Sequence, residues 1–266
     1  MIRFVPVIAV CLALTLVFPS FAAVQTKLPV SDPQAVAYAA QSILALTGGT
    51  PIADAKLTGT ATWTVGSDNQ SGSVTLMGKG TSESRTDLGL SGGNRTEIRN
   101  SFGGFPQGAW VGSDGVSHSY AMHNCWTDAN WLFPVLSSLS NTDPNIILSY
   151  VGLESRSGVS VQHLRSYRAL FQSISSDALT EQLSTMDFYL DATSFLPVAV
   201  TFSVHPDDDA NVTIPVEIDY SNYQITNGAQ LPLHVQKFLQ GGLVLDLVIT
   251  SASPNTGLSD SNFNIQ

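Results

Sequence analysis

Period-two alternation of apolar and polar residues, repeated between residues 185 and 250, constrains the fold of this chain more than any other feature. Because successive side chains of a β-strand point to opposite faces, such a run predicts a strand with one apolar and one polar face. An antiparallel sheet of such strands has a continuous apolar face that something must cover. The apolar positions of the three clearest runs are Leu196, Val198, Val200, Phe202 and Val204; Val212, Ile214, Val216, Ile218 and Tyr220; and Leu243, Leu245, Leu247 and Ile249.

Residues 1–23 are typical of a secretory signal peptide. Arg3 supplies a positive start, residues 4–18 are almost wholly apolar, and small residues allow cleavage near Ala22 or Ala23. A membrane anchor would need about 20 apolar residues and a charged stop. We therefore expect a mature protein that is periplasmic or extracellular and is not an integral membrane protein.

The rest of the chain, residues 24–266, has the length of a single domain, and no linker or repeat divides it. Cys11 lies too early for the lipobox of a lipoprotein. Removal of the signal peptide leaves Cys125 as the one cysteine, so an ordinary core must hold the fold without an internal disulfide. The net charge of −10 leaves no basic patch for phosphates, which excludes nucleic acid as a partner.

Helix signals are few. The residues from Ser31 to Gln34 form a capping-box pattern, and Gly48 and Gly49 stop the segment, so we expect an amphipathic helix that ends at Thr47. Everything else indicates strand and turn. The other expected elements are short helices over Asp128–Leu136 and Asp177–Leu183, a strand over 57–65, a turn over 67–72, and central strands over 146–153 and 159–170.

Charges predict the register of one hairpin, over Glu83 to Arg99. With the turn centred on Ser91, every charged pair across the hairpin is opposite in sign, which contributes a few tenths to about 1 kcal/mol for each pair. The hairpin is then polar on both sides, and we expect it to project from the body or to line a wet rim. The three pairs are Glu83 with Arg99, Arg85 with Glu97, and Asp87 with Arg95.

Three motifs suggest chemistry, and each has a plainer interpretation. Gly89–Gly93 has the G-x-S-x-G spacing of a hydrolase, but that motif needs a helix after it, and here a strand follows. His118, His123 and Cys125 are residue types that bind zinc, but His118 would point to the other face of the strand. Asp207–Asp209 suits calcium by charge alone and otherwise fits a solvated hairpin loop. We assign no catalytic residue, metal ligand or cofactor.

Three landmarks in the second half suggest a family. Asp191–Pro197 joins two alternating strands, Tyr220–Pro232 joins two more, and Ser259–Phe263 closes the chain. Over residues 185–266 this succession resembles the periplasmic lipoprotein-carrier superfamily of the LolA and LolB type, to which a sigma-factor regulator and mycobacterial glycolipid carriers are related. The resemblance implies an open, incomplete β-barrel whose concave apolar face is plugged by helices and binds acyl chains. The hairpin at 83–99 and the helix at 128–136 depart from that pattern.

We therefore predict a mainly β fold: an antiparallel, strongly curved open half-barrel with two or three short helices that cover the concave face. The apolar face of the alternating strands would line a cavity for an apolar ligand. The alternative is that the same residues form an ordinary closed core. The cavity candidates are Leu196, Val198, Val200, Phe202, Val216, Ile218, Leu245 and Leu247.

The functional hypothesis that follows is a non-enzymatic binding protein for a lipid, a lipoprotein acyl chain or another apolar small molecule. The alternative is a protein–protein interaction or sensing module of the cell envelope, with an envelope protein as partner and no lipid cargo. An extracellular hydrolase that uses Ser91 ranks third. The volume and lining of a cavity would separate the carrier from the scaffold.

Overall fold

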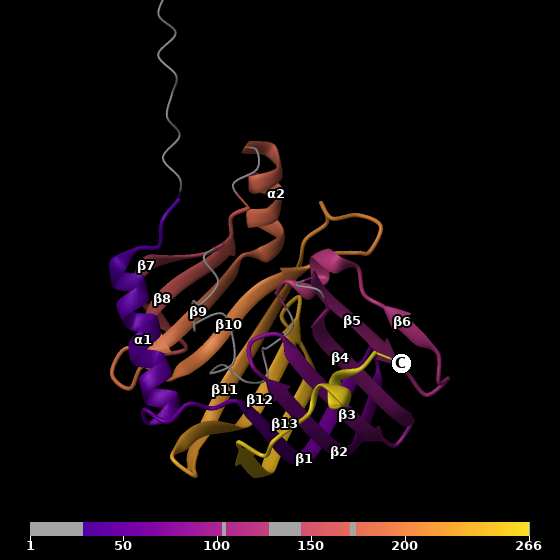
Figure 1. Cartoon of the computed structure of the whole chain (residues 1–266). Helices are drawn as coiled ribbons and strands as arrows, with labels where there is room; N and C mark the ends of the chain where they lie inside the picture. Colours follow the sequence, from indigo (N-terminus) through magenta and orange to yellow (C-terminus); the bar gives the residue numbers. More distant parts are fainter. Residues whose placement is uncertain (1–28, 103–104, 128–144, 171–173, 266) are drawn as a thin grey trace, which may run out of the picture.

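The computed structural model describes residues 29–102, 105–127, 145–170 and 174–265. These residues form one antiparallel sheet of 13 strands in the order β6-β5-β4-β3-β2-β1-β13-β12-β11-β10-β9-β8-β7 (Figure 1). Strands β1 to β6 make one meander and strands β7 to β13 make another. The two meanders join where β1 pairs with β13.

The bounds of the elements are as follows. The first meander contains β1 (Asp54–Val65), β2 (Asp68–Lys79), β3 (Glu83–Leu90), β4 (Gly93–Phe102), β5 (Phe105–Val111) and β6 (Ser117–Ser119). The second contains β7 (Ile146–Arg156), β8 (Val159–Arg168), β9 (Met186–Asp191), β10 (Pro197–Val204), β11 (Ile214–Thr226), β12 (Ala229–Leu239) and β13 (Gly242–Pro254). The helices are α1 (Pro33–Thr47) and α2 (Ile174–Ser184), with the short 3₁₀ turns η1 (Met122–Cys125) and η4 (Asp260–Phe263).

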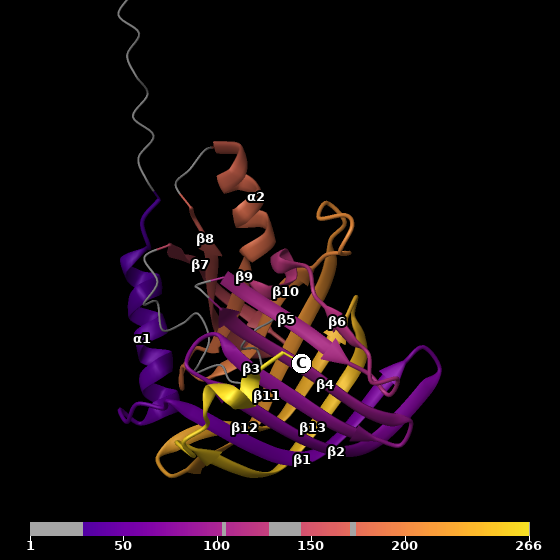
Figure 2. The same ribbon diagram turned by 45° about the vertical axis from the view of Figure 1, so that its right-hand side comes forward.

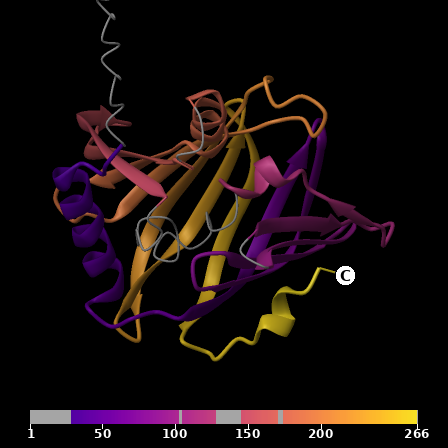
Figure 3. The same cartoon turned by 45° about the horizontal axis from the view of Figure 1, so that its top comes forward.

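The sheet is strongly curved and remains open. The two meanders bend toward each other around a concave side (Figures 2 and 3). Within the described residues the edge strands β6 and β7 do not pair with each other. Helix α1 packs on β7, β8 and β12, and α2 packs on β8 and β10. These features confirm the predicted antiparallel open half-barrel.

One large apolar cluster fills the concave side. It takes the inward residues of the alternating strands, among them Val200, Ile218 and Leu247, and joins them to residues of β1, β2 and β3. Ala35, Ala39 and Leu46 of α1 are buried in the same cluster. Helix α1 therefore covers part of the apolar face that the alternation predicts.

Helix α1 confirms the first predicted helix and corrects its cap. Asp32 is the capping residue, and its carboxylate accepts a hydrogen bond from the backbone N–H of Gln34. Ser31 instead accepts a hydrogen bond from the backbone N–H of Leu148, which ties the start of the helix to β7. Gly48 ends the helix in the left-handed region at φ 58°, where a residue without Cβ fits best.

The other two predicted helices have different outcomes. Helix α2 confirms the prediction over Asp177–Leu183, although it begins three residues earlier, at Ile174. The helix predicted over Asp128–Leu136 lies outside the described residues. No helix in the described part of the chain is long and apolar enough to cross a membrane.

One predicted turn and one predicted strand position were wrong. The turn over 67–72 is only the pair Gly66 and Ser67, because Val65 already pairs with Asp68 and the following polar residues belong to β2. The strand over 146–153 is an edge strand and not a central one, as β7 ends the sheet. Alternation predicts which side chains of a strand are buried, but it does not predict which strands lie next to it in the sheet.

The predicted register of the 83–99 hairpin was wrong by one residue. Leu90 pairs with Gly93 across the two-residue turn Ser91-Gly92, a loop length that hairpins favour. The resulting pairs are Ser84 with Arg99, Thr86 with Glu97, and Leu88 with Arg95. The ion pairs form along each strand instead: Arg85 Nε to Asp87 Oδ2 at 2.8 Å, and Arg95 Nε to Glu97 Oε1 at 2.9 Å.

The predicted register put all the charged residues of the hairpin on one face, whereas the observed register divides them between two faces, because side chains alternate along a strand. Arg95, Glu97 and Arg99 turn to the concave side, whereas Arg85 and Asp87 turn to the outer side. The hairpin also does not project from the body. It lies within the sheet, between β2 and β5.

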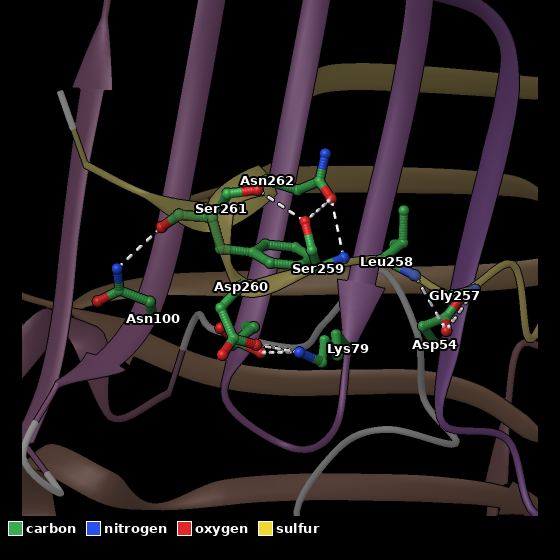
Figure 4. A network of polar contacts seen from close by, with 11 residues as sticks. Asp54, Lys79, Asn100, Gly257, Leu258, Ser259, Asp260, Ser261 and Asn262 are labelled. Atoms are coloured by element: carbon green, nitrogen blue, oxygen red, sulfur yellow. Dashed lines mark hydrogen bonds and ion pairs between the residues drawn. The ribbon is translucent and has the colours of Figure 1, made fainter.

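The last residues of the chain, 255–265, cross the outer face of the first meander; we call them the C-terminal strap (Figure 4). Phe263 is fully buried there against Met77 and Ile98. The carboxylate of Asp54 accepts hydrogen bonds from the backbone N–H groups of Thr256 to Leu258, and Lys79 pairs with Asp260. The strap thus closes an apolar patch on the side opposite the concavity.

Candidate ligand-binding pocket

A pocket of about 620 Å³ lies between the two meanders on the concave side. Strands β1, β3, β4 and β5 supply one wall, and β10 to β13 supply the other. The volume falls within the range of about 300–1,000 Å³ that is usual for small-molecule sites. Its apolar lining includes Trp63, Leu88, Trp110, Val204 and Leu245.

The strand register explains why charged side chains share this pocket with apolar ones. Thr86, Glu97 and Trp110 are cross-strand partners in one row over β3, β4 and β5. On the other wall Lys237 pairs with Leu245, so the two side chains face the same way. The curvature of the sheet then brings β4 and β12 to opposite sides of one hollow.

Arg95 contacts two tryptophan rings. Its guanidinium carbon is 4.4 Å from the ring centroid of Trp110 and 5.4 Å from that of Trp63, distances at which a cation is attracted to a ring face. Its Nε donates a hydrogen bond to Glu97 Oε1. In the same row of charges, the guanidinium of Arg99 lies 3.6 Å from the ring centroid of Tyr120.

The pKa of Glu97 indicates the sign of the electrostatic field in the pocket. Burial by itself would raise the pKa of this carboxyl. The positive charges of Lys237, Arg95 and Arg99, together with the hydrogen bond from Arg95, outweigh burial and lower the pKa below its usual value. Glu97 is therefore ionised, and the surroundings of its carboxylate are positive.

A buried polar cluster forms one end of the pocket. Asn124 donates a hydrogen bond to the carbonyl of His205 at 2.7 Å and accepts one from its backbone N–H at 2.8 Å. The Nδ1 of His205 lies 2.9 Å from the carbonyl oxygen of Val212 and therefore donates to it. Among the described residues its Nε2 has no hydrogen-bond partner, although only 4 % of the residue is exposed. His205 and Asn124 both line the pocket.

Asp207, Asp208 and Asp209 are exposed, as expected for a solvated loop, but Asp207 also joins the polar cluster. Asp207 lines the pocket and accepts hydrogen bonds from the backbone N–H of Ala121 at 3.2 Å and from Asn124 at 3.4 Å. Asp209 instead accepts a hydrogen bond from the backbone N–H of Asn211 within the loop. The loop therefore has one carboxylate that joins it to η1.

A smaller hollow of about 370 Å³ shares His205 and Val216 with the first one and lies near the end of α2. Phe202 and Val216 line it, but polar groups such as Thr201, Asp187 and Glu217 make up much of its wall. Since apolar sites are lined mainly by hydrophobic side chains, the larger pocket fits an apolar ligand better.

The eight cavity candidates from the sequence occupy different places. Val216 and Leu245 line the larger pocket, while Phe202 and Val216 line the smaller one. Val198 packs against Val161, Tyr189 and Ala199 instead of joining the main core, because the pairing of β10 with β9 shifts between Pro197 and Ala199. The other four, Leu196, Val200, Ile218 and Leu247, pack in or against the main core.

Sequence reasoning missed the charged and aromatic part of the pocket. Trp63, Arg95, Glu97, Trp110 and Lys237 were not candidates. The register of the 83–99 hairpin could have indicated Arg95 and Glu97, since a two-residue turn at Ser91-Gly92 places both opposite Leu88 and Thr86. No local signal brings β12 near β4, because that approach depends on the curvature of the whole sheet.

The other motifs do not form a site in the described residues. His118 stacks on Trp110 at 4.1 Å, His123 lies edge-on to His205, and Cys125 is buried in η1. No group of three or more potential metal ligands is found in the described part of the chain. Ser91 lies in the turn between β3 and β4, as expected for a hairpin tip.

Comparison with known proteins gives structural matches only. No protein-family model and no curated protein matches this sequence. An outer membrane lipoprotein-sorting protein domain from Vibrio parahaemolyticus superimposes with a TM-score of 0.58 at 14% identity, over 87% of this chain and 96% of that one. A DUF1329 family protein from Desulfovibrio piger has a TM-score of 0.55 at 13% identity, over 89% and 100% of the two chains.

A third solved structure is a LolA superfamily protein from Nitrosomonas europaea. It superimposes with a TM-score of 0.51 at 12% identity, over 86% of this chain and 97% of that one. Identities this low show a common fold and nothing finer. The chain has a LolA-like fold, which confirms the resemblance read from its second half.

Proposed function

We propose that this chain is a non-enzymatic binding protein that holds an acyl chain or a similar apolar molecule in the pocket of about 620 Å³ between its two meanders. The observation that carries the proposal is the pocket itself, a hollow of ligand size on the concave side of an open sheet. Val216 and Leu245 are the proposed contacts among the residues expected from the sequence, and Trp63, Leu88 and Val204 join them.

Three physical features support this function. An open sheet has walls that can separate slightly without breaking a closed ring of hydrogen bonds. Tryptophan and aliphatic side chains on both walls would exclude water from a hydrocarbon chain, at about 25 cal/mol for each Å² of apolar surface buried. The lipoprotein-sorting domain from Vibrio parahaemolyticus shares this fold, and a role in lipoprotein sorting agrees with an acyl ligand.

The binding test uses N-phenyl-1-naphthylamine, a neutral probe that fluoresces in apolar pockets. We expect the wild-type protein to bind the probe and Val204→Trp to lose most of the signal, because an indole at this position would fill the pocket. Val151→Trp is the matched control, since Val151 is 48% exposed on the edge strand β7. Equal probe binding by both variants, or no binding by the wild type, would contradict the proposal.

We propose further that residues 1–23 are removed on secretion and that the mature protein works in the periplasm or outside the cell. Mass spectrometry of the mature protein from its native host should show a first residue just after Ala22 or Ala23. Organic extraction of the same sample should release a lipid. Purification with an envelope protein and without lipid would instead favour the interaction module.

A further inference from the structure

The charges in the pocket contrast with those of the whole molecule. The chain has a net charge of −10, yet three of its 11 basic residues, Arg95, Arg99 and Lys237, line this one hollow. Two carboxylates, Glu97 and Asp207, line it as well. Positive charge is therefore in excess by one, in a place where a purely hydrocarbon ligand would need no charge at all.

Arg95 is the best placed of these cations for a ligand. Its Nε donates to Glu97, and the rings of Trp63 and Trp110 lie next to the guanidinium carbon. Among the described residues its two terminal nitrogens donate no hydrogen bond. They form the fork that binds a carboxylate or a phosphate through two parallel hydrogen bonds.

The electrostatic field agrees with this geometry. Lys237 lies on the opposite wall, and its charge is the strongest of the three that keep the pKa of Glu97 low in spite of burial. A second anion in the same space would feel the same three cations. Because the pocket is partly closed from water, that attraction is stronger than at the protein surface.

We propose that the ligand is an amphiphile with an anionic head group, and that the head is held at Arg95 while the tail lies along Leu88, Val204 and Leu245. This inference rests on the proposed function and specifies its ligand class. Carboxylate and phosphate heads share the required chemistry. The rings of Trp63 and Trp110 near Arg95 would contact the first carbons of the tail.

The test compares decanoate with decanol, which have the same chain length and differ in the charge of the head. Each ligand competes with N-phenyl-1-naphthylamine at low ionic strength and pH 7.5. We expect decanoate to displace the probe at a concentration about tenfold lower than decanol, as one charge-assisted contact predicts. Decyl phosphate should behave like decanoate, and salt should reduce the advantage of both anions.

Two variants of the pocket should act in opposite directions. Arg95→Gln removes the guanidinium fork, so decanoate and decanol should then displace the probe at nearly equal concentrations. Glu97→Gln removes the competing carboxylate and should strengthen decanoate binding. Lys56→Gln, on the exposed outer side of β1, is the control for loss of one positive charge and should leave the preference unchanged.

The outcomes separate the two proposals. Decanol competition in every variant shows that the pocket is folded and accepts a chain. Equal displacement by decanoate and decanol, or an unchanged preference in Arg95→Gln, overturns the anionic head group and leaves the apolar pocket standing. A wild-type protein that does not bind the probe overturns the proposed function itself.

Discussion

At the scale of single residues, His163 has the most clearly defined dependence on pH. It lies between two carboxylates, with Nδ1 2.5 Å from Glu154 Oε1 and Nε2 2.8 Å from Asp187 Oδ1. Burial lowers the pKa of the imidazole, but the hydrogen bonds and charges of Asp187 and Glu154 outweigh burial and raise it. The folded protein therefore binds this proton more tightly than the unfolded chain does.

The stability that His163 provides should be complete below the unfolded pKa of about 6.5 and should disappear as pH rises through the higher folded pKa. We expect His163→Gln to lower the free energy of unfolding by about 1–3 kcal/mol at pH 5.5 and by clearly less at pH 9. Urea unfolding at both values measures the difference. His123→Gln, which removes no ion pair found among the described residues, is the control; a loss for His163→Gln that is equal at the two pH values would contradict the prediction.

Side-chain alternation predicts which face of the sheet a residue occupies, but it does not predict a bulge or a shift of one residue in strand pairing. Val198 follows the sequence pattern and yet packs with Val161 on the other face, because the ladder shifts beside it. The predicted register of Arg95 and Glu97 was wrong by one residue because charge pairing across strands competes with charge pairing along a strand, and here the latter occurs. A bulge or a turn of different length reverses every side chain that follows it.

At the scale of elements, the C-terminal strap closes the outer face of the first meander. Phe263 is fully buried against Met77, Ile98 and the partly buried Leu258. Arg85 also donates a hydrogen bond to the carbonyl of Asn262, and Asn100 donates one to the carbonyl of Phe263. The strap is thus held by one aromatic anchor and by backbone contacts along its length.

Phe263→Ala should destabilise the protein by about 3–5 kcal/mol, the usual cost of removing a fully buried aromatic ring. The measurement is the urea midpoint together with the slope of the transition. Asn264→Ala changes an exposed neighbour on the same segment and should alter the free energy of unfolding by less than about 0.5 kcal/mol. A small loss in Phe263→Ala would mean that the strap is not part of the cooperative fold.

The elements themselves could largely be predicted from the sequence. Helix α1, helix α2 and the strands of the second meander follow from apolar periodicity and from caps such as Gly48. The edge position of β7 and the pairing of β1 with β13 could not be predicted, because pairing depends on contacts between strands far apart in the chain. The sequence predicted the C-terminal strap only as a segment that closes the chain, and it did not predict which face of the sheet the strap covers.

At the scale of the whole molecule, two meanders bend around one pocket that is apolar in most of its lining and cationic at Arg95. The open half-barrel was predictable because alternating strands with few helices have few ways to bury an apolar face. The pocket was not predictable from the sequence, because its walls come from strands that are distant in sequence. These strands meet only through the curvature of the sheet. This combination is the basis of the proposal that the pocket binds an anionic amphiphile.

A crystal structure with a fatty acid brominated at the end of its chain would locate the ligand by the anomalous signal of bromine. We expect the bromine peak inside the pocket near Leu245, and the carboxylate density within hydrogen-bond distance of the terminal nitrogens of Arg95. A bromine peak on the outer face of the sheet, or a pocket that stays without ligand at saturating fatty acid, would contradict binding between the two meanders.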